Sequence, residues 1–135
     1  MRYLLDTNTC IYYLNAPVPT GLVERFRNLG PDALALSAIT VAELAFGAER
    51  SSRAAANRRR VALLTAELRC LPFDERCAER FGGLKASLQA SGVSLADFDA
   101  AIVATAQVHG LTLVSHDQAL LAVPGLDLED WVQEA

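Results

Sequence analysis

Short, continuously apolar runs alternate along the chain with longer segments in which apolar residues recur every three to four positions. The short runs are typical of buried strands and the periodic segments of amphipathic helices. The predicted strands are residues 3–6, 34–37, 70–73 and 111–115, with 126–131 as a last edge strand or cap. The first predicted helix ends at residue 14. The other predicted helices cover residues 21–29, 40–50, 53–69, 75–90 and 97–108, with a helical turn at 117–121.

Short polar side chains precede several of these helices and can accept hydrogen bonds from the first free backbone N–H groups. Thr7 or Asn8 is therefore expected to cap the first helix, and Asp74 the helix that ends near residue 90. Asp97 is expected to be the N-cap of the helix that runs to residue 108.

The alternation of strands with helices predicts an α/β fold in which helices cover both faces of a parallel sheet. The chain has 135 residues and shows no repeat, low-complexity segment or long linker. We therefore expect one domain over residues 1–135. In such sheets the functional residues gather where strands end, near the point at which the strand order reverses.

Acidic residues occupy these positions. Asp6 ends the first strand, Asp117 follows the fourth, and Asp97 and Asp99 open a helix. Glu43 instead lies within a helix among apolar neighbours, where a charge needs water or a partner. Together these acids make a candidate site at one edge of the sheet.

Each acid also has a purely structural interpretation. Asp6 and Asp117 can be turn or capping residues, and Asp97 a cap. Asp99 can stabilise the positive end of its helix, and Glu43 can be a solvated helix residue. As a group, however, two carboxylates about 4 Å apart repel by roughly 4 kcal/mol at an effective dielectric near 20. A bound Mg²⁺ or Mn²⁺ removes this repulsion, prefers oxygen ligands and activates water against phosphate esters.

Composition narrows the function classes. The apolar content of 52% and charged content of 21% are those of a folded globular protein. No apolar run is long enough to span a bilayer and no secretion signal is visible, so we expect a cytoplasmic protein. The three cysteines lack the spacing of a zinc site. The net charge of −4 argues mildly against nucleic-acid binding, although six of the twelve cations lie between residues 50 and 69.

Several other features have competing interpretations. The run Arg58-Arg59-Arg60 can be a solvated helix face, an RNA-backbone contact or a partner contact. Aromatic side chains can stack on bases or pack in the core. The residues with this choice are Tyr12, Tyr13 and Phe46. Ser115-His116-Asp117 contains the residue types of a hydrolase triad, but neighbouring residues point to opposite sides and cannot form the relay.

Five segments in the same order resemble those of PIN-domain ribonucleases, specifically the VapC toxins of toxin–antitoxin systems. They are LLDTN at 4–8, VAEL at 41–44 with Gly47, DFDAAIVATA at 97–106, GLTLVSHD at 110–117 and VPGLDLEDW at 123–131. Any one segment is weak evidence, but the ordered set spans nearly the whole chain.

The resemblance implies a three-layer α/β/α domain with a central, mainly parallel sheet of about five strands. It implies Mg²⁺-dependent cleavage of RNA, inhibition by a VapB-type antitoxin and a homodimer. The first three family acids fall on Asp6, Glu43 and Asp99, and the fourth position falls on Asp117. Asp6 and Asp99 are the expected primary metal ligands. Supporting polar groups near the metal are expected at Thr7, Asn8, Asp97 and Ser115.

Two other function classes fit parts of the sequence. One is a catalytically silent PIN-like module that binds RNA or protein, which the presence of all the acids disfavours. The other is a phosphatase or receiver-like protein with a strand-end aspartate. Such phosphatases need a second acid two residues later, where this chain has Asn8, and receivers need a lysine after a strand. The only lysine, Lys85, lies in a predicted helix.

Overall fold

The computed structural model describes residues 1–132 of the chain. Its strands are β1 (Tyr3–Leu5), β2 (Leu34–Ser37), β3 (Arg69–Leu71), β4 (Thr112–Val114) and β5 (Leu128–Glu129). Its α-helices are α1 (Thr7–Leu14), α2 (Thr20–Leu29), α3 (Ala38–Arg50), α4 (Ala54–Glu67), α5 (Glu75–Ala90) and α6 (Asp97–Val108). Two 3₁₀ helices cover η1 (Pro31–Ala33) and η2 (Gln118–Ala122).

All five strands are parallel and form one sheet in the order β3-β2-β1-β4-β5. The chain moves outward from β1 through β2 to β3 and then returns to the other side of β1 with β4. The strand order therefore reverses at β1 and β4, whose carboxyl ends are the expected position of a ligand site.

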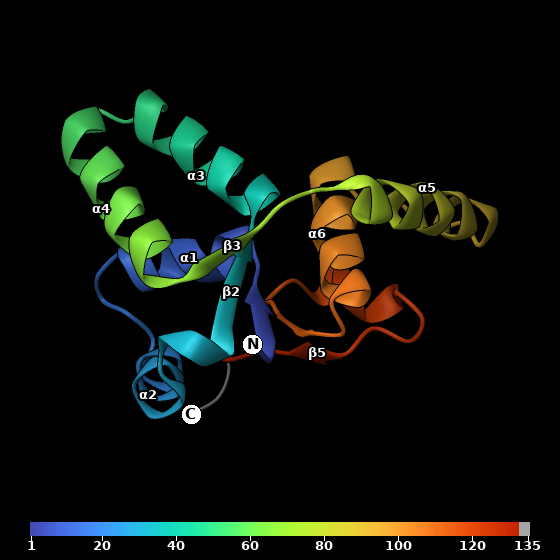
Figure 1. Ribbon diagram of the computed structural model, residues 1–135, viewed down its shortest axis with the longest axis horizontal. Coiled ribbons are helices and arrows are strands. Elements are labelled where there is room, and N and C mark those ends of the chain that lie inside the picture. The colour runs from blue at the N-terminus through green and yellow to red at the C-terminus, as the bar shows by residue number, and fades with distance from the viewer. Residues whose placement is uncertain (133–135) are drawn as a thin grey trace.

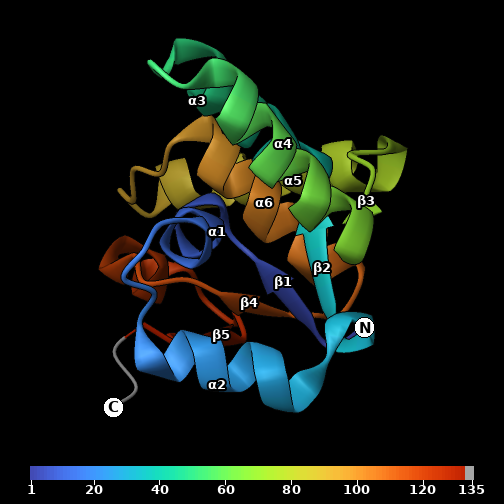
Figure 2. The same cartoon turned by 90° about the vertical axis from the view of Figure 1, so that its left-hand side faces the viewer.

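Helices cover both faces of the sheet, as the sequence predicts. Figure 1 shows α1, α2, α3 and α4 on one side of the sheet and α5 and α6 on the other. Figure 2 looks onto the first side, with α1 and α4 in front of the strands and α6 behind them. The fold is thus the expected three-layer α/β/α arrangement around a five-stranded sheet.

Alternate residues of each strand point to opposite faces, which produces two apolar cores. In β1, Leu4 packs in the core beneath α5 and α6, whereas Tyr3 and Leu5 pack in the core beneath α1 to α4. The buried Trp131 joins the second core and meets the ring of Tyr3 edge-on at 4.9 Å between ring centroids. The C-terminal segment is thereby fixed against the first strand.

The N-caps of three helices differ from the sequence expectation. Asp6, rather than Thr7 or Asn8, caps α1, because its carboxylate accepts from the backbone N–H of Thr9. Ser37 caps α3, so this helix begins at Ala38, two residues earlier than predicted.

The third difference concerns α6, which begins at Asp97 as its first helical residue. Ala96 occupies the N-cap position and makes no side-chain capping bond. The expectation that Asp97 caps this helix is therefore wrong. The prediction for α5 is confirmed, since Asp74 caps it.

The expected single domain over 1–135 stays a prediction, and residues 133–135 of it lie outside the described residues. Among the helices in residues 1–132, none combines the length and apolar character needed to cross a bilayer.

Candidate active site

Four carboxylates from separate elements lie close enough to influence one another at the carboxyl edge of the sheet. Burial raises the pKa of the Asp99 carboxyl above its usual value. The further causes are the negative charges of Asp117, Glu43 and Asp6, in that order. The structure therefore brings together four of the five acids that the sequence singles out, all except Asp97.

Asp6 is the most enclosed of the four, with 8% of its surface exposed. Its backbone N–H donates to the carbonyl oxygen of Val114 at 3.0 Å, which ties the end of β1 to β4. One carboxylate oxygen, Oδ1, accepts from the N–H of Thr9 at 2.8 Å. Desolvation raises the pKa of Asp6, and hydrogen bonds from Ser115 and Thr9 partly offset this rise. The other oxygen, Oδ2, is not used by the helix cap.

Glu43 is held by hydroxyl groups rather than by a cation. The Thr7 hydroxyl donates to Glu43 Oε1 at 2.6 Å, a short distance expected of a bond to a charged acceptor. Thr7 Oγ1 also lies 3.1 Å from Thr40 Oγ1, which in turn lies 3.4 Å from Ser37 Oγ. These hydroxyls link the start of α1 to α3, and they provide the partner that a half-buried acid among apolar neighbours requires.

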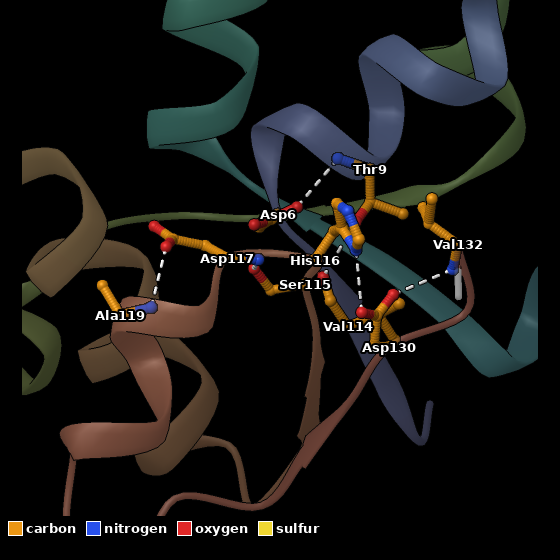
Figure 3. A network of polar contacts seen from close by, with 9 residues as sticks. All are labelled: Asp6, Thr9, Val114, Ser115, His116, Asp117, Ala119, Asp130 and Val132. Atoms are coloured by element: carbon orange, nitrogen blue, oxygen red, sulfur yellow. Dashed lines mark hydrogen bonds and ion pairs between the residues drawn. The ribbon is translucent and has the colours of Figure 1, made fainter. Parts of the chain in front are cut away.

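Asp117 and Ser115 belong to the loop after β4. The Ser115 hydroxyl oxygen accepts from the backbone N–H of Asp117 at 3.0 Å, and Asp117 Oδ1 caps η2 by accepting from Ala119 N–H at 2.9 Å. Figure 3 shows Asp6 and Ser115 between the side chains of Asp117 and His116, which leave the loop on opposite sides. Ser115 thus contacts both aspartates, and its predicted role near a metal stays a prediction.

Two predicted supporting residues lie at the surface. Asp97 is exposed and forms an ion pair with Lys85 Nζ at 3.0 Å, so its carboxylate is directed to α5. Asn8 is also exposed, in the first turn of α1. Their predicted role near a metal stays a prediction, and the Lys85 contact does not favour it for Asp97.

His116 has a partner that the sequence does not indicate. Its Nδ1 lies 2.8 Å from Asp130 Oδ2, and its ring meets Tyr12 edge-on with 5.9 Å between centroids. The Ser115-His116-Asp117 relay is absent, because Ser115 bonds to the Asp117 backbone and His116 to Asp130. The sequence contains a run of acidic residues before Trp131, but no pattern in it pairs Asp130 with His116, fourteen positions earlier.

The aromatic and basic candidates divide between structural and exposed positions. Tyr13 stacks on Phe26 at 3.9 Å between centroids and serves packing. Tyr12 and Phe46 are 39% and 62% exposed. On α4, Arg58 pairs with Glu49 at the surface.

A groove of about 210 Å³ opens beside Glu43, between α1, α3 and α4. Its lining includes Ile11, Leu14, Glu43, Gly47, Arg60 and Val61. The groove is mainly apolar, with one acid at the end next to the site and one cation on α4. A bound segment in this groove would therefore lie beside the carboxylates.

The donor set fits a hard divalent cation. Across residues 1–132, no ion pair joins any of the four carboxylates to a lysine, arginine or histidine of the chain. Oxygen ligands with unbalanced negative charge are what Mg²⁺ and Mn²⁺ prefer. In the described part of the chain, no three acidic, histidine or cysteine side chains already surround one point as a formed site. Binding would therefore require movement of at least one of these side chains, such as rotation of Asp117 away from its capping geometry.

We expect the metal-free protein to lose stability as pH rises through the titration of Asp6 and Asp99. Their raised pKa values mean that, above the usual value of 3.8, the folded state binds protons more readily than the unfolded state. The free energy of unfolding then falls with rising pH until the folded-state pKa is passed. Asp6→Asn removes the contribution of Asp6 to this pH dependence of the free energy of unfolding. Asparagine can still cap the helix.

Urea denaturation in EDTA between pH 4 and 7.5 measures this effect. The stability of Asp6→Asn relative to the unmodified protein should increase with pH. If the difference in free energy of unfolding between the two proteins stays constant with pH, or changes in the opposite direction, the raised pKa of Asp6 is contradicted.

Three comparisons with known proteins agree with this geometry. The family model described as "PIN domain" matches residues 3–126. The chain is 33% identical to a Salmonella typhimurium protein named tRNA(fMet)-specific endonuclease VapC, over 97% of this chain and 98% of that protein. It is 35% identical to Ribonuclease VapC2 of Haemophilus influenzae, over 98% and 99%. The structure of DNA-bound VapBC from Salmonella typhimurium contains a similar chain, with a TM-score of 0.91, 32% identity and coverage of 97% and 98%.

Proposed function

The chain belongs to the PIN-domain family, and from this premise we propose that it is a VapC-type ribonuclease whose active site is the carboxylate cluster. It hydrolyses phosphodiester bonds of RNA, and a VapB-type antitoxin inhibits it. The observation that carries the proposal is the mutual influence of four acids from separate elements, none of them paired with a cation within residues 1–132.

We assign the metal site to Asp6 and Asp99, with Glu43 and Asp117 completing the acidic pocket. A bound Mg²⁺, or Mn²⁺ in its place, supplies Lewis-acid polarisation of the phosphate and activation of water. The protein's own contribution is orientation. Thr9 and Ser115 fix the carboxylate of Asp6, and Thr7 fixes that of Glu43. Burial of Asp6 excludes water from one side of the pocket and strengthens its attraction for a cation.

Thr7→Val is expected to lower the cleavage rate roughly tenfold, because a hydrogen bond that orients a ligand is typically worth a factor of about 10 to 100 in metal affinity or activity. Valine matches threonine in shape but cannot donate to Glu43. The expected signature is a higher Mg²⁺ concentration for half-maximal rate with little change in KM for RNA. Thr65→Val on α4, which removes a hydroxyl bonded only to its own helix, is the matched control.

The substrate class is tested by incubating the purified chain with total tRNA, initiator tRNA and ribosomal RNA in Mg²⁺. Initiator tRNA is included because the names of two relatives specify tRNA(fMet). Specific cleavage of any of these RNAs supports an enzyme. Binding without cleavage supports instead the silent PIN-like module, which we consider the second candidate.

The antitoxin is proposed to occupy the groove beside Glu43, with apolar side chains in the groove and a basic side chain toward the acids. Apolar lining and the adjacent negative charge support this arrangement. A small gene product encoded next to this chain should stop RNA cleavage at equimolar concentration. The homodimer and the cytoplasmic location stay predictions, and light scattering during size-exclusion chromatography measures the first.

A further inference from the structure

The side chain of His116 is held in one orientation at the edge of the active site. Its Nδ1 lies 2.8 Å from Asp130 Oδ2, and the other oxygen of Asp130 accepts from the N–H of Val132 at 3.0 Å. Figure 3 shows the ring beside Asp6 and Ser115, on the side opposite to Asp117. The imidazole is thus attached to the site through its own loop and oriented by the C-terminal segment.

The hydrogen bond to Asp130 determines which ring nitrogen is available. A carboxylate only accepts, so Nδ1 carries a hydrogen, and Nε2 is the ring nitrogen left to contact a ligand; in uncharged imidazole this second nitrogen is an acceptor. Within residues 1–132, Nε2 of His116 has no hydrogen-bond partner, and it is not among the buried polar atoms that lack one. It therefore faces solvent as an acceptor beside the carboxylate cluster.

Tyr12 adds an aromatic surface next to this acceptor. Its ring contacts His116 at an interplanar angle of 85°, and 39% of the residue is exposed. An exposed aromatic ring beside a hydrogen-bond acceptor is a suitable contact for a nucleoside, which has both a flat base and sugar hydroxyl groups.

The chemistry of the proposed function requires a contact of this kind. When water is the nucleophile, the ribose 2′-hydroxyl takes no part in bond breaking, and DNA contains the same phosphodiester group. A direct contact to the 2′-hydroxyl, which is both a donor and an acceptor, is then one way to prefer RNA over DNA of the same sequence. With the four carboxylates assigned to the metal site, His116 is a side chain of the loop after β4 whose ring is held in place by Asp130 and whose Nε2 reaches solvent.

We propose that His116 accepts a hydrogen bond from the 2′-hydroxyl of a nucleotide next to the cleaved bond, while Tyr12 packs against the same nucleotide. Asp130 is the positioning residue that fixes the ring. His116 is then the residue that selects RNA over DNA. This inference rests on the proposed ribonuclease function and extends it to the recognition of the sugar.

The test compares a short RNA with the same RNA carrying single 2′-deoxy nucleotides. The cleaved bond is first mapped with the unmodified protein in whichever of the tested RNAs it cleaves, and a 12-nucleotide RNA covering that bond is synthesised. The ratio of kcat/KM for the all-RNA substrate to that for each 2′-deoxy substrate is then measured. We expect a ratio of about tenfold at one nucleotide beside the bond, the upper range for one net hydrogen bond.

In His116→Phe, which keeps a ring but lacks the acceptor, this ratio should fall to within twofold of unity. His116→Leu serves as a second variant and should give the same ratio. Asp130→Asn, whose neutral amide holds the ring less firmly, should give an intermediate ratio. The matched control is His109→Asn, which removes the other histidine at the far end of α6 and should retain the full ratio.

The failures of the two proposals are distinguishable. If the unmodified protein cleaves RNA but the 2′-deoxy ratio is unity, or is unchanged in both His116 variants, the inference about His116 is overturned and the ribonuclease remains. If the unmodified protein cleaves no RNA, the proposed function is overturned and the inference with it.

Discussion

Asp6→Asn is expected to lower the rate of RNA cleavage roughly a thousandfold while the protein stays folded. The loss of one carboxylate charge about 4 Å from a cation is about 4 kcal/mol at an effective dielectric near 20, which corresponds to roughly a thousandfold in rate. The fold survives because asparagine can still accept the hydrogen bond from Thr9 that caps α1. The substitution also removes a buried carboxyl group whose pKa is raised by desolvation.

Single-turnover cleavage of a labelled RNA measures this effect, and far-UV circular dichroism with urea denaturation verifies the fold. Asp32→Asn is the matched control, since Asp32 is exposed and precedes β2 at the amino edge of the sheet. If folded Asp6→Asn protein cleaves RNA at the rate of the unmodified protein, Asp6 is not part of the active site.

The second large effect concerns the sheet that positions these acids. Leu4→Ala should reduce the free energy of unfolding by roughly 3–4 kcal/mol, within the range measured for fully buried leucines. Leu4 lies in the central strand, is completely buried and packs in the core beneath α5 and α6. The cavity would form two residues before Asp6, at the centre of a parallel sheet that cannot easily collapse around it.

Chemical denaturation of Leu4→Ala and of Leu63→Ala separates burial from residue type. Leu63 is 72% exposed on α4, and its truncation should change stability by less than about 0.5 kcal/mol. Equal losses in the two variants would show that the central strand does not have the buried position described above.

Features that depend on local sequence could be predicted from the sequence. The apolar run of β2 and the helix over residues 97–108 have the predicted bounds, because strand and helix periodicity are local properties. The position of acids after β1 and β4 also follows from local order, together with the rule that parallel strands end at one edge. The predicted grouping of Asp6 with Asp99 and Glu43 agrees with the electrostatic coupling in the structure.

Features that depend on distant contacts could not be predicted in this way. Asp97 has the local sequence of a helix cap, but Lys85 on α5 pairs with it in the folded chain. His116 has no local partner and acquires Asp130 only when β5 is placed beside β4. The hydroxyl contacts between Thr7 and Glu43 likewise join residues 36 positions apart. Each contact depends on how helices and strands pack against one another in three dimensions, which a single sequence does not specify.

The most direct measurement is cleavage of RNA by the purified chain as a function of Mg²⁺. We expect cleavage in millimolar Mg²⁺, complete loss after EDTA, and full recovery when Mg²⁺ is restored. Asp6→Asn should stay inactive throughout, while Asp32→Asn should follow the unmodified protein. Cleavage that continues undiminished in EDTA, or RNA that remains intact at every Mg²⁺ concentration, would contradict the assignment of the carboxylate cluster as a metal-dependent ribonuclease site.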